Sequence, residues 1–307
     1  MASMKRRDRL EAWEYRARIL PLRRLHDLRE ALEDAYGQGL FDEEFYSERL
    51  GEFVFEAPAE MPAARSLVIA AYRDPPVRFT FFWKGNPFQA IVPPTYLHWR
   101  EKDERAAQAL IKRLQPEGRR MIPAAVPKKL LAVRSGLAAY GNNNITYING
   151  LGSFFRLAAF FSDLPCAEDP WTEPRRLGAC NNCRICRLAC PAGAIVKERF
   201  LLHAERCLTY WNEKPKTVPF PGWLAAGWHN CLVGCLRCQT VCPENRSVLE
   251  RVEEGGRFTE QETKLLLEHL PQTALPSSLV EKLENWGLLE LVDILPRNLK
   301  ALLTARE

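Results

Sequence analysis

The sequence predicts an α+β fold in which helices and strands are followed by a cysteine-rich segment and a short helical end. Three observations carry this prediction. Hydrophobic residues make up 47% and charged residues 26% of the 307 residues, which is ordinary for a globular protein and excludes disorder or a coiled coil for the whole chain. Apolar residues repeat at helical spacing in some segments and form short unbroken runs in others. Nine of the ten cysteines fall between residues 180 and 242.

The first half of the chain is expected to mix helices with at least one buried strand. Residues 6–37, rich in Arg, Leu, Ala and Glu, predict one or two amphipathic helices, and residues 101–114 predict another. The apolar run at 66–72 is short and followed by prolines, which indicates a buried strand. Residues 128–135 predict a further helix that Gly136 ends.

A tight turn is expected at Asn149-Gly150, between residues 144–147 and 151–155. Asn-Gly is the preferred pair for a two-residue hairpin turn, because both central positions then take a positive φ. The sequence therefore predicts a hairpin at this point of the chain.

Three short helices are expected after residues 253–255. Two of them have capping boxes at their starts, where a Ser or Thr is followed three residues later by Glu: Thr259–Glu262 and Ser278–Glu281. Gly287 is expected to end the second of these helices.

The cysteine spacing is typical of proteins with two iron–sulfur clusters. Residues 180–190 form a complete Cys-x2-Cys-x2-Cys-x3-Cys-Pro run, and residues 235–242 end in a second Cys-Pro. In such ferredoxins three cysteines of a run bind one cluster and the fourth binds the other. This rule assigns Cys180, Cys183, Cys186 and Cys242 to one 4Fe-4S cluster, and Cys190, Cys235, Cys238 and one further cysteine to the other.

The eighth ligand is either Cys207 or Cys231 on the spacing alone. Structural zinc, which also uses Cys-x2-Cys pairs, is the alternative to the clusters, but zinc does not call for a run ending in Pro. Cys166 stands apart from the pattern and is expected to be a small buried side chain.

Other common sites are missing from the sequence. It has no Gly-x-Gly-x-x-Gly or phosphate-binding loop, and its five histidines form no His-x-x-His pair. No apolar run reaches the roughly 18 residues of a membrane helix, and no signal segment is evident, so we expect a cytoplasmic protein with no membrane contact. The net charge of +5 permits nucleic-acid contact without arguing for it.

The motifs around the cysteines resemble the epoxyqueuosine reductase family, cobalamin- and iron–sulfur-dependent enzymes of queuosine tRNA maturation that are distantly related to reductive dehalogenases. The resemblance runs from about residue 62 to 303 and is specific near the cysteines. Its blocks are Val133–Gly141, Asn142–Tyr147, Gly152–Phe155, Phe161–Leu164, Arg206–Tyr210 and Gly234–Pro243.

This resemblance implies three consecutive domains. Residues 1–165 would form a nitroreductase-like α+β domain that holds base-off cobalamin, meaning cobalamin without its lower base ligand. Residues 166–250 would form a double 4Fe-4S ferredoxin-like domain that passes electrons to the cobalt, and residues 251–307 a short helical segment. The family's Arg-Cys motif supplies a cluster ligand, so the resemblance selects Cys207 over Cys231.

The resemblance also implies where the corrinoid ring would lie. Loop amides and asparagine side chains can bond its amide arms without adding charge. The residues implied to bind it are Arg134, Gly141, Asn142, Asn143, Asn144, Asn149, Gly150 and Ser153. Tyr140 and Tyr147 are candidate proton donors, as tyrosine is in the related dehalogenases; the alternative is that both are packed aromatics.

Two departures from the family pattern bear on the substrate. The family carries an aspartate, thought to be the proton donor, where alignment on residues 133–137 places Ile122. An isoleucine cannot donate a proton. The sequence also ends where many members continue into a helical-repeat region that helps hold tRNA.

Three functions remain open from the sequence. The first is a cobalamin-dependent reductase with a small or tRNA-borne substrate, which need not be epoxyqueuosine. The second is an electron-transfer protein that reduces a corrinoid or a partner protein. The third is a flavin-dependent reductase of nitroreductase-like fold. Each would receive electrons from a low-potential donor such as ferredoxin or flavodoxin.

Overall fold

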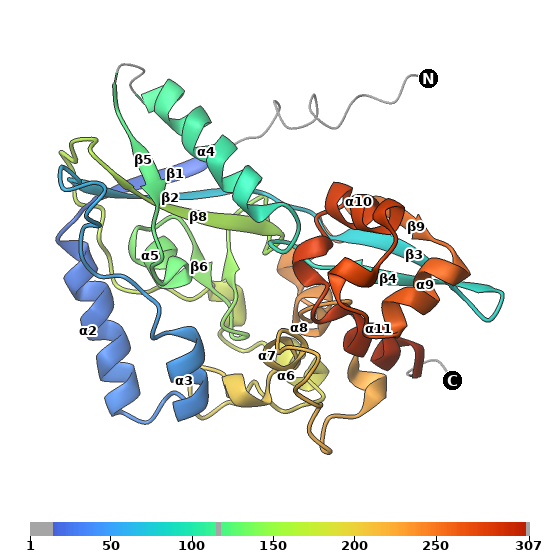
Figure 1. The fold of residues 1–307 in the computed structure, drawn as a ribbon. Helices are drawn as coiled ribbons and strands as arrows, with labels where there is room; N and C mark the ends of the chain where they lie inside the picture. The colour runs from blue at the N-terminus through green and yellow to red at the C-terminus, as the bar shows by residue number, and fades with distance from the viewer. Residues whose placement is uncertain (1–14, 115–117, 305–307) are drawn as a thin grey trace. The chain divides into compact units, whose positions relative to one another are not determined.

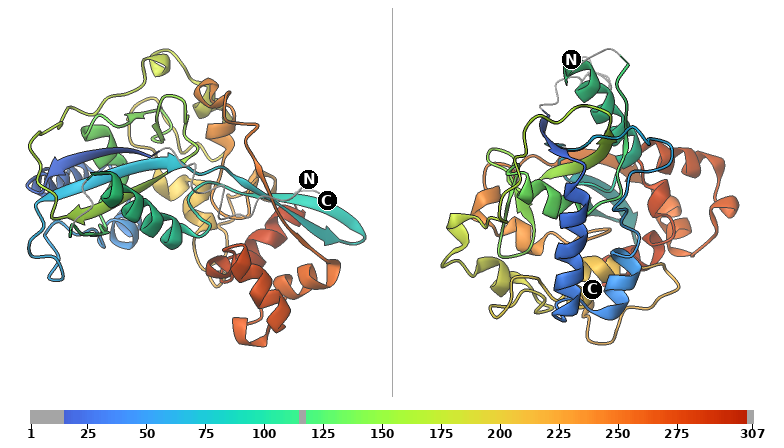
Figure 2. Two further views of the ribbon diagram at one scale, coloured as in Figure 1. Left: turned by 90° about the horizontal axis from the view of Figure 1, so that it is seen from above. Right: turned by 90° about the vertical axis from the view of Figure 1, so that its left-hand side faces the viewer.

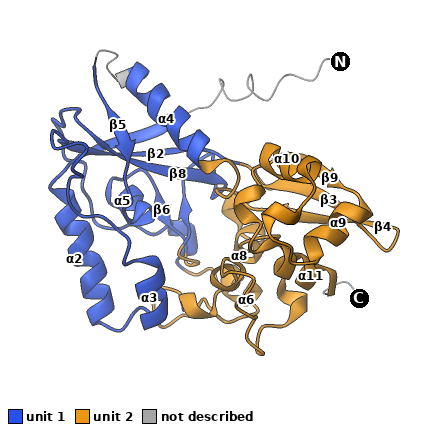
Figure 3. Cartoon of the chain, in the orientation of Figure 1, with its two compact units in different colours: residues 1–74, 100–141, 145–181 blue, residues 75–99, 142–144, 182–307 orange. Residues whose placement is uncertain are grey.

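The computed structural model describes residues 15–114 and 118–304, and their contacts form two compact units (Figure 3). Unit 1 comprises residues 1–74, 100–141 and 145–181, and unit 2 comprises residues 75–99, 142–144 and 182–307. These units differ from the three consecutive domains expected from the sequence. The C-terminal segment and the cysteine-rich segment group together with residues 75–99.

Unit 1 is built on a four-stranded antiparallel sheet in the order β1-β2-β8-β5 (Figure 1). The strands are β1 (Arg16–Pro21), β2 (Ser66–Arg73), β8 (Phe155–Ser162) and β5 (Met121–Pro123). The strand expected at 66–72 is confirmed as β2, whose first seven residues are buried. Both central strands, β2 and β8, are almost continuously apolar, as expected for strands covered on two faces.

The helix prediction for residues 6–37 is partly wrong. Residues before 15 lie outside the described part of the chain, β1 occupies Arg16–Pro21, and only α2 (Arg24–Gly37) is helical. The residues of β1 pair in antiparallel register with β2, from Arg16 opposite Ala71 to Pro21 opposite Ser66. Pairing with an apolar strand distant in sequence overrides the local helical composition here.

Helices cover the sheet of unit 1. The helices expected at 101–114 and 128–135 are confirmed as α4 (Trp99–Leu114) and α5 (Lys128–Arg134), and Gly136, with φ of 70°, follows α5. A further helix, α3 (Glu43–Arg49), begins at Asp42, whose side chain accepts a hydrogen bond from Phe45 N. Figures 1 and 2 show α4 along one face of the sheet, where Ala106, Ala107 and Leu110 belong to the same buried apolar cluster as residues of β2 and β8.

A charged network is buried beneath α4. Arg156 of β8 donates from Nη2 to Asp103 Oδ2 at 2.6 Å and from Nε to Asp103 Oδ1 at 2.7 Å. Tyr72 donates to the same carboxylate at 2.7 Å. Asp103 and Arg156 are 6% and 7% exposed, so each charge depends on the other for compensation.

We expect the single change Asp103→Ala to lower the free energy of unfolding by about 3–5 kcal/mol, because Arg156 would be left as an unpaired buried charge. The double change Asp103→Leu with Arg156→Met removes both charges and should recover most of that loss. Denaturant unfolding followed by circular dichroism measures both. A double variant no more stable than the single one would contradict this account of the network.

The Asn149-Gly150 turn forms the expected hairpin in minimal form: Ile148 and Gly152 pair as a single antiparallel bridge, and Ile148 N donates to Gly152 O at 2.9 Å. Leu151 N donates to Ile148 O at 2.9 Å across the turn, and only Gly150, with φ of 77°, is left-handed. The segment before the turn, β7 (Thr146–Tyr147), pairs instead with β6 (Ala139–Tyr140). The turn therefore lies at the end of a small two-stranded sheet, and the strand after it, β8, pairs with β2.

Unit 2 contains a three-stranded sheet in the order β4-β3-β9. The antiparallel pair β3 (Val77–Trp83) and β4 (Asn86–Val92) is joined by a two-residue turn, and β9 (Glu253–Phe258) runs parallel to β3. The strand β9 was not predicted from the sequence, because its two glycines give no strand signal. They allow close packing: a Cβ on Gly255 would lie 2.7 Å from Phe79 Cε1, and one on Gly256 would lie 2.6 Å from Trp286 Nε1.

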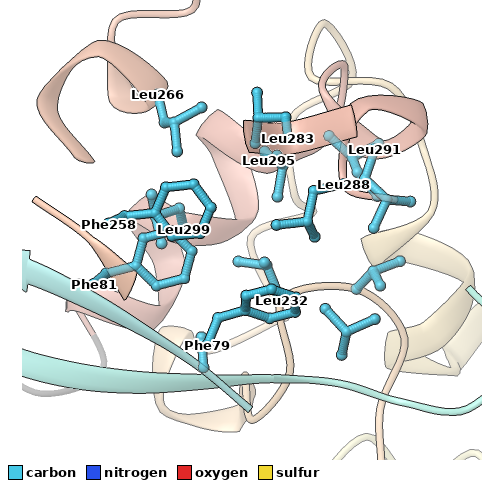
Figure 4. Packing of buried hydrophobic residues seen from close by; sticks show 14 of the residues in the cluster. Phe79, Phe81, Leu232, Phe258, Leu266, Leu283, Leu288, Leu291, Leu295 and Leu299 are labelled. Carbon is cyan, nitrogen blue, oxygen red and sulfur yellow. The ribbon is translucent and has the colours of Figure 1, made fainter. Parts of the chain in front are cut away.

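The three C-terminal helices are confirmed as α9 (Glu260–Leu267), α10 (Ser277–Asn285) and α11 (Leu295–Thr304). Figure 4 shows leucines of these helices packed against Phe79, Phe81 and Phe258 of the sheet. The capping box at Thr259 is confirmed, with Glu262 N donating to Thr259 Oγ1 at 3.2 Å.

The second capping box is wrong, because α10 begins one residue earlier than Ser278 and Pro276 precedes it without a side-chain cap. Gly287, with φ of 68°, follows the end of α10 as expected.

The cysteine-rich segment of unit 2 has short helices and single turns. Its α-helices are α6 (Ile185–Ala189), α7 (Leu208–Asn212) and α8 (Arg237–Thr240). The chain's 3-10 turns are η1 (Gly178–Cys180), η2 (Ala204–Arg206), η3 (Ala226–Trp228), η4 (Pro243–Asn245), η5 (Gln272–Ala274) and η6 (Leu289–Leu291). Among the described helices, none has the length and apolar character needed to cross a lipid bilayer.

Candidate metal centre

Two short helices in unit 2 carry one cysteine each and pack against one another. Cys186 lies in α6 and Cys238 in α8. Each helix is followed within two residues by a Cys-Pro pair, Cys190-Pro191 and Cys242-Pro243. Proline lacks the N–H that would continue a helix, so the backbone leaves the helical path at equivalent points after α6 and after α8. The two halves of the cysteine pattern therefore have the same local structure.

Four thiols of unit 2 lie close enough to act on one another electrostatically. Burial raises the pKa of Cys235 to about 12, and the neighbouring Cys207 and Cys190 add to the rise. Burial also raises the pKa of Cys238 well above its ordinary value, again with a contribution from Cys207 and Cys235. Cys190, Cys207, Cys235 and Cys238 thus form one group, which we call the second ligand set.

This group matches the ligand set that the crossing rule predicts for one cluster. Cys207 precedes α7, and its thiol accepts hydrogen bonds from Thr209 and from Tyr210 N, which offset part of the rise in its pKa caused by burial. Thiolates are the form that binds metal, and four of them brought together need a positively charged group to offset their repulsion. The donor chemistry therefore fits the iron of a 4Fe-4S cluster.

Cys231 has a different environment from Cys207. It is fully buried, and burial is the main cause of its raised pKa. The neighbouring Cys235 thiol adds to this rise. The next residue, Leu232, belongs to the apolar core of unit 2, and its N–H donates to Ile91 O of β4 at 2.7 Å. The Cys207 thiol raises the pKa of Cys235 and of Cys238, and Cys190 raises the pKa of Cys207. This proximity to three cysteines of the set favours Cys207 as the eighth ligand.

The other four cysteines of the crossing rule, Cys180, Cys183, Cys186 and Cys242, are called the first ligand set, and they do not all belong to one unit. Cys183, Cys186 and Cys242 belong to unit 2, whereas Cys180 ends η1 and belongs to unit 1. Cys186 also contributes to the raised pKa of Cys238, so the two ligand sets are neighbours within unit 2.

Within residues 15–114 and 118–304, no three His, Cys, Asp or Glu side chains are grouped closely enough to hold a single metal ion.

Tyr96, which no sequence pattern singles out, holds the second cysteine run in place. The Tyr96 hydroxyl donates to the Glu213 carboxylate, and a Cβ on Gly234 would lie 2.7 Å from that hydroxyl. Gly234 also has φ of 65°, so a side chain is excluded there on both grounds. Asn212 Nδ2 donates to Gly234 O at 2.8 Å. These contacts fix the chain just before Cys235.

Two asparagines expected at a corrinoid ring have their partners in the cysteine segment. Asn142 Nδ2 donates to Cys183 O at 3.2 Å. Asn143 is 2% exposed and hydrogen-bonds the Cys238 thiol. Asn144 has φ of 58° and turns the chain back toward unit 1.

The other residues expected at the corrinoid ring lie in unit 1. Gly141 N donates to Ile145 O at 2.8 Å and closes the loop, Ser153 is 6% exposed, and the Asn149-Gly150 turn is exposed. Arg134 forms an ion pair with Glu173 at 3.1 Å. At the turn, the Arg16 guanidinium donates to Asn149 O.

The candidate proton donors are buried aromatics of unit 1. Tyr140 and Tyr147 are 7% and 3% exposed, and burial raises the pKa of Tyr140. Ile122 lies in β5 opposite Phe161 of β8. Cys166 is partly exposed, and its thiol donates to Glu168 O at 2.8 Å, so the expectation of a buried Cys166 is wrong.

Comparison with known proteins identifies the cysteine-rich segment. Residues 179–245 match the family model of the 4Fe-4S double cluster binding domain. This segment contains all cysteines of both ligand sets, together with Cys231. The chain therefore has a double 4Fe-4S cluster-binding domain.

Curated relatives confirm the resemblance drawn from the motifs. The epoxyqueuosine reductase of Cyclobacterium marinum is 33% identical over 132 residues, which cover 43% of this chain and 41% of that protein. The enzyme of Burkholderia pseudomallei is 32% identical over 173 residues, covering 52% of this chain and 42% of the relative. The matched segments thus span less than half of each of these relatives.

Solved structures show that the fold is also shared. The epoxyqueuosine reductase of Streptococcus thermophilus superposes with a TM-score of 0.63 at 16% identity, covering 95% of this chain and 77% of that one. The structure from Bacillus subtilis gives 0.61 at 20% identity, covering 94% and 77%. At such identities the likeness establishes the mixed helix-and-sheet fold.

Proposed function

We propose that this protein is an iron–sulfur oxidoreductase that uses two 4Fe-4S clusters to reduce a bound cobalamin, and through it a substrate. The observation that carries the proposal is the second ligand set, Cys190, Cys207, Cys235 and Cys238, which lie together inside a segment that matches a double-cluster domain. Cys180, Cys183, Cys186 and Cys242 would bind the other cluster.

The electron path follows from the arrangement of unit 2. Cys186 and Cys238, one from each ligand set, lie on packed helices and act on one another electrostatically. Two clusters held there would be close enough for an electron to pass between them. A low-potential carrier such as ferredoxin or flavodoxin is the proposed donor, because the chain has no nucleotide-binding loop that would hold a soluble hydride donor.

Cobalamin is the proposed acceptor because of the resemblance to the epoxyqueuosine reductases and of their shared fold. When bound and reduced, cobalamin supplies a strong nucleophile and reductant. The residues proposed to hold it are Arg134, Gly141, Asn142, Asn143, Asn144, Asn149, Gly150 and Ser153. The exposed Asn149-Gly150 turn supports this, since its groups are neutral hydrogen-bonding partners for the amide arms.

An electron-transfer protein without a substrate of its own is the second candidate. It is favoured by Ile122, which leaves the position of the family proton donor without an acid. The solved structures include an epoxyqueuosine reductase with an epoxyqueuosine-modified tRNA stem loop. A tRNA substrate is therefore proposed for this chain only as one possibility beside a small molecule.

Metal analysis after anaerobic reconstitution tests the iron–sulfur part of the proposal. We expect about eight iron atoms and eight acid-labile sulfides per chain, from two cubes of four each. Two zinc ions and no iron would contradict it. Binding of flavin in place of cobalamin, seen as a yellow protein with bound isoalloxazine, would instead support a flavin-dependent reductase.

A further inference from the structure

The helix α6 presents two apolar side chains to solvent beside a cluster cysteine. Leu188 is 72% exposed and Ile185 is 42% exposed, whereas Cys186, between them in sequence, is 9% exposed. Residues three apart in a helix lie on one face, so Ile185 and Leu188 are neighbours on the exposed face of α6. These side chains add little to the core of unit 2, and their apolar surface is left for a partner.

The neighbouring helix α8 adds a third apolar side chain. The two helices pack against one another (Figure 1), and Val241, the residue that follows α8, is 40% exposed. In the described part of unit 2, Trp223 is the one other large apolar side chain with such exposure. Apolar surface is therefore concentrated at the two helices that carry Cys186 and Cys238. We call Ile185, Leu188 and Val241 the apolar patch.

Positive charge accompanies the apolar patch. Residues 182–197 contain two arginines and a lysine and no acid. Arg184 is exposed and lies one helical turn before Leu188, whose N–H donates to the Arg184 carbonyl at 3.0 Å. Residues 235–249 add two arginines and one acid, Glu244. An apolar centre with a positively charged rim is complementary to an acidic protein surface.

We propose that the apolar patch, with Arg184 at its edge, is the docking surface for an acidic ferredoxin that delivers electrons to the clusters. The inference rests on the proposed function, because it needs the clusters to be present. In each transfer the ferredoxin is oxidised by one electron and one cluster of this chain is reduced by one. The patch lies on the helices whose cysteines would bind the two clusters, so a partner seated there comes close to both.

The apolar side chains favour a protein partner over a nucleic acid. Phosphate groups would be attracted by the same arginines, but Leu188 offers them no hydrogen bond and no charge. Transient complexes of redox proteins have small interfaces, so a patch of a few side chains with a charged rim is sufficient for one.

The test measures how fast a reduced ferredoxin of strongly negative net charge reduces the clusters of the reconstituted full chain, by stopped-flow absorbance. In Arg184→Glu we expect the second-order rate constant at low ionic strength to fall by about tenfold or more, because an attraction becomes a repulsion. Lys264→Glu is the matched control, an equal charge reversal at an exposed residue of α9, and should keep nearly the full rate. Added salt should reduce the difference between the two variants.

A second variant, Leu188→Ser, covers the case in which Arg184→Glu fails to hold a cluster. Because Leu188 is largely exposed, its replacement should leave the iron content unchanged. We expect the ferredoxin concentration that gives half of the maximal rate to rise by about fivefold, since apolar contact is lost from the complex. Titanium(III) citrate, a small reductant that needs no docking surface, should reduce the clusters of every variant at the rate of the unmodified protein.

The outcomes separate this inference from the proposal on which it rests. Absence of iron in the unmodified protein would overturn both. Clusters that titanium(III) citrate reduces and ferredoxin does not would overturn the docking surface alone, and so would equal rates in Arg184→Glu and Lys264→Glu or an unchanged Leu188→Ser.

Two further results would assign the apolar patch to another occupant. A dimer in gel filtration that dissociates in Leu188→Ser would show that a second copy of this chain covers it. Binding of tRNA that is lost in Arg184→Glu, with the ferredoxin rate unchanged, would show that the positive charge serves a nucleic acid. Either result would overturn the inference.

Discussion

Replacing Cys207 with alanine is expected to remove one of the two clusters, so that iron and sulfide fall to about half, from roughly eight to four atoms of each per chain. The matched change Cys231→Ala should leave both clusters in place. The Cys207 thiol raises the pKa of Cys235 and of Cys238, and Cys190 raises that of Cys207. Cys231 is fully buried, has Cys235 as a neighbouring thiol and precedes Leu232 of the apolar core. Iron determination and the visible absorbance of the reconstituted variants measure the difference.

The reverse result would reassign the eighth ligand. If Cys231→Ala lost half of the iron and Cys207→Ala kept all of it, the second ligand set would have to include Cys231. Cys231→Ala also removes a fully buried sulfur, so some loss of stability is expected from the cavity, about 1–2 kcal/mol, without loss of metal. Unfolding curves of the two variants distinguish that effect from a lost cluster.

The largest expected gain of activity comes from restoring an acid at position 122. We expect the unmodified protein to reduce epoxyqueuosine in tRNA poorly, and Ile122→Asp to increase the single-turnover rate by about 10²–10⁴-fold, the usual contribution of general acid catalysis. The change should be tolerated by the fold, because Ile122 is only partly buried and lies in β5, the edge strand of its sheet. A single-turnover assay with reduced protein, cobalamin and epoxyqueuosine-bearing tRNA measures the rate.

The variant Ile122→Asn is the matched control, since it has the size and polarity of the aspartate but cannot act as the acid. Activity in the aspartate variant and not in the asparagine variant would support a reductase whose natural substrate has diverged from epoxyqueuosine. Robust activity in the unmodified protein would show that another group donates the proton or that Ile122 does not occupy the aspartate's position.

Short-range patterns were predictable from the sequence. The cysteine spacing predicts the double-cluster segment because several ligands of each cube come from one short run, where their spacing can be read directly, and the fourth cysteine of a run binds the other cluster. The apolar run of β2 and the amphipathic pattern of α4 were also sufficient to locate both elements. Thr259 and Glu262 marked the start of α9 for the same reason, since a capping box is a local contact.

Long-range contacts account for what the sequence could not predict. The strand β1 depends on pairing with β2, and the glycine-containing strand β9 depends on pairing with β3, far earlier in the chain. Within the site, the contact of Asn143 with Cys238 joins residues that are distant in sequence. Asparagines in a loop are equally consistent with a ligand contact or a structural one, so only the fold reveals which partner each has.

The central claim, that the clusters serve a bound cobalamin, is tested most directly by the visible spectrum of the anaerobically reconstituted protein mixed with cobalamin. Binding in the base-off state is predicted to shift the corrinoid absorption bands, and addition of a low-potential reductant should then bleach the iron–sulfur absorbance and convert the corrinoid spectrum in turn. A spectrum that is the simple sum of those of free cobalamin and protein, together with removal of the cobalamin by gel filtration, would contradict the claim and favour the electron-transfer protein.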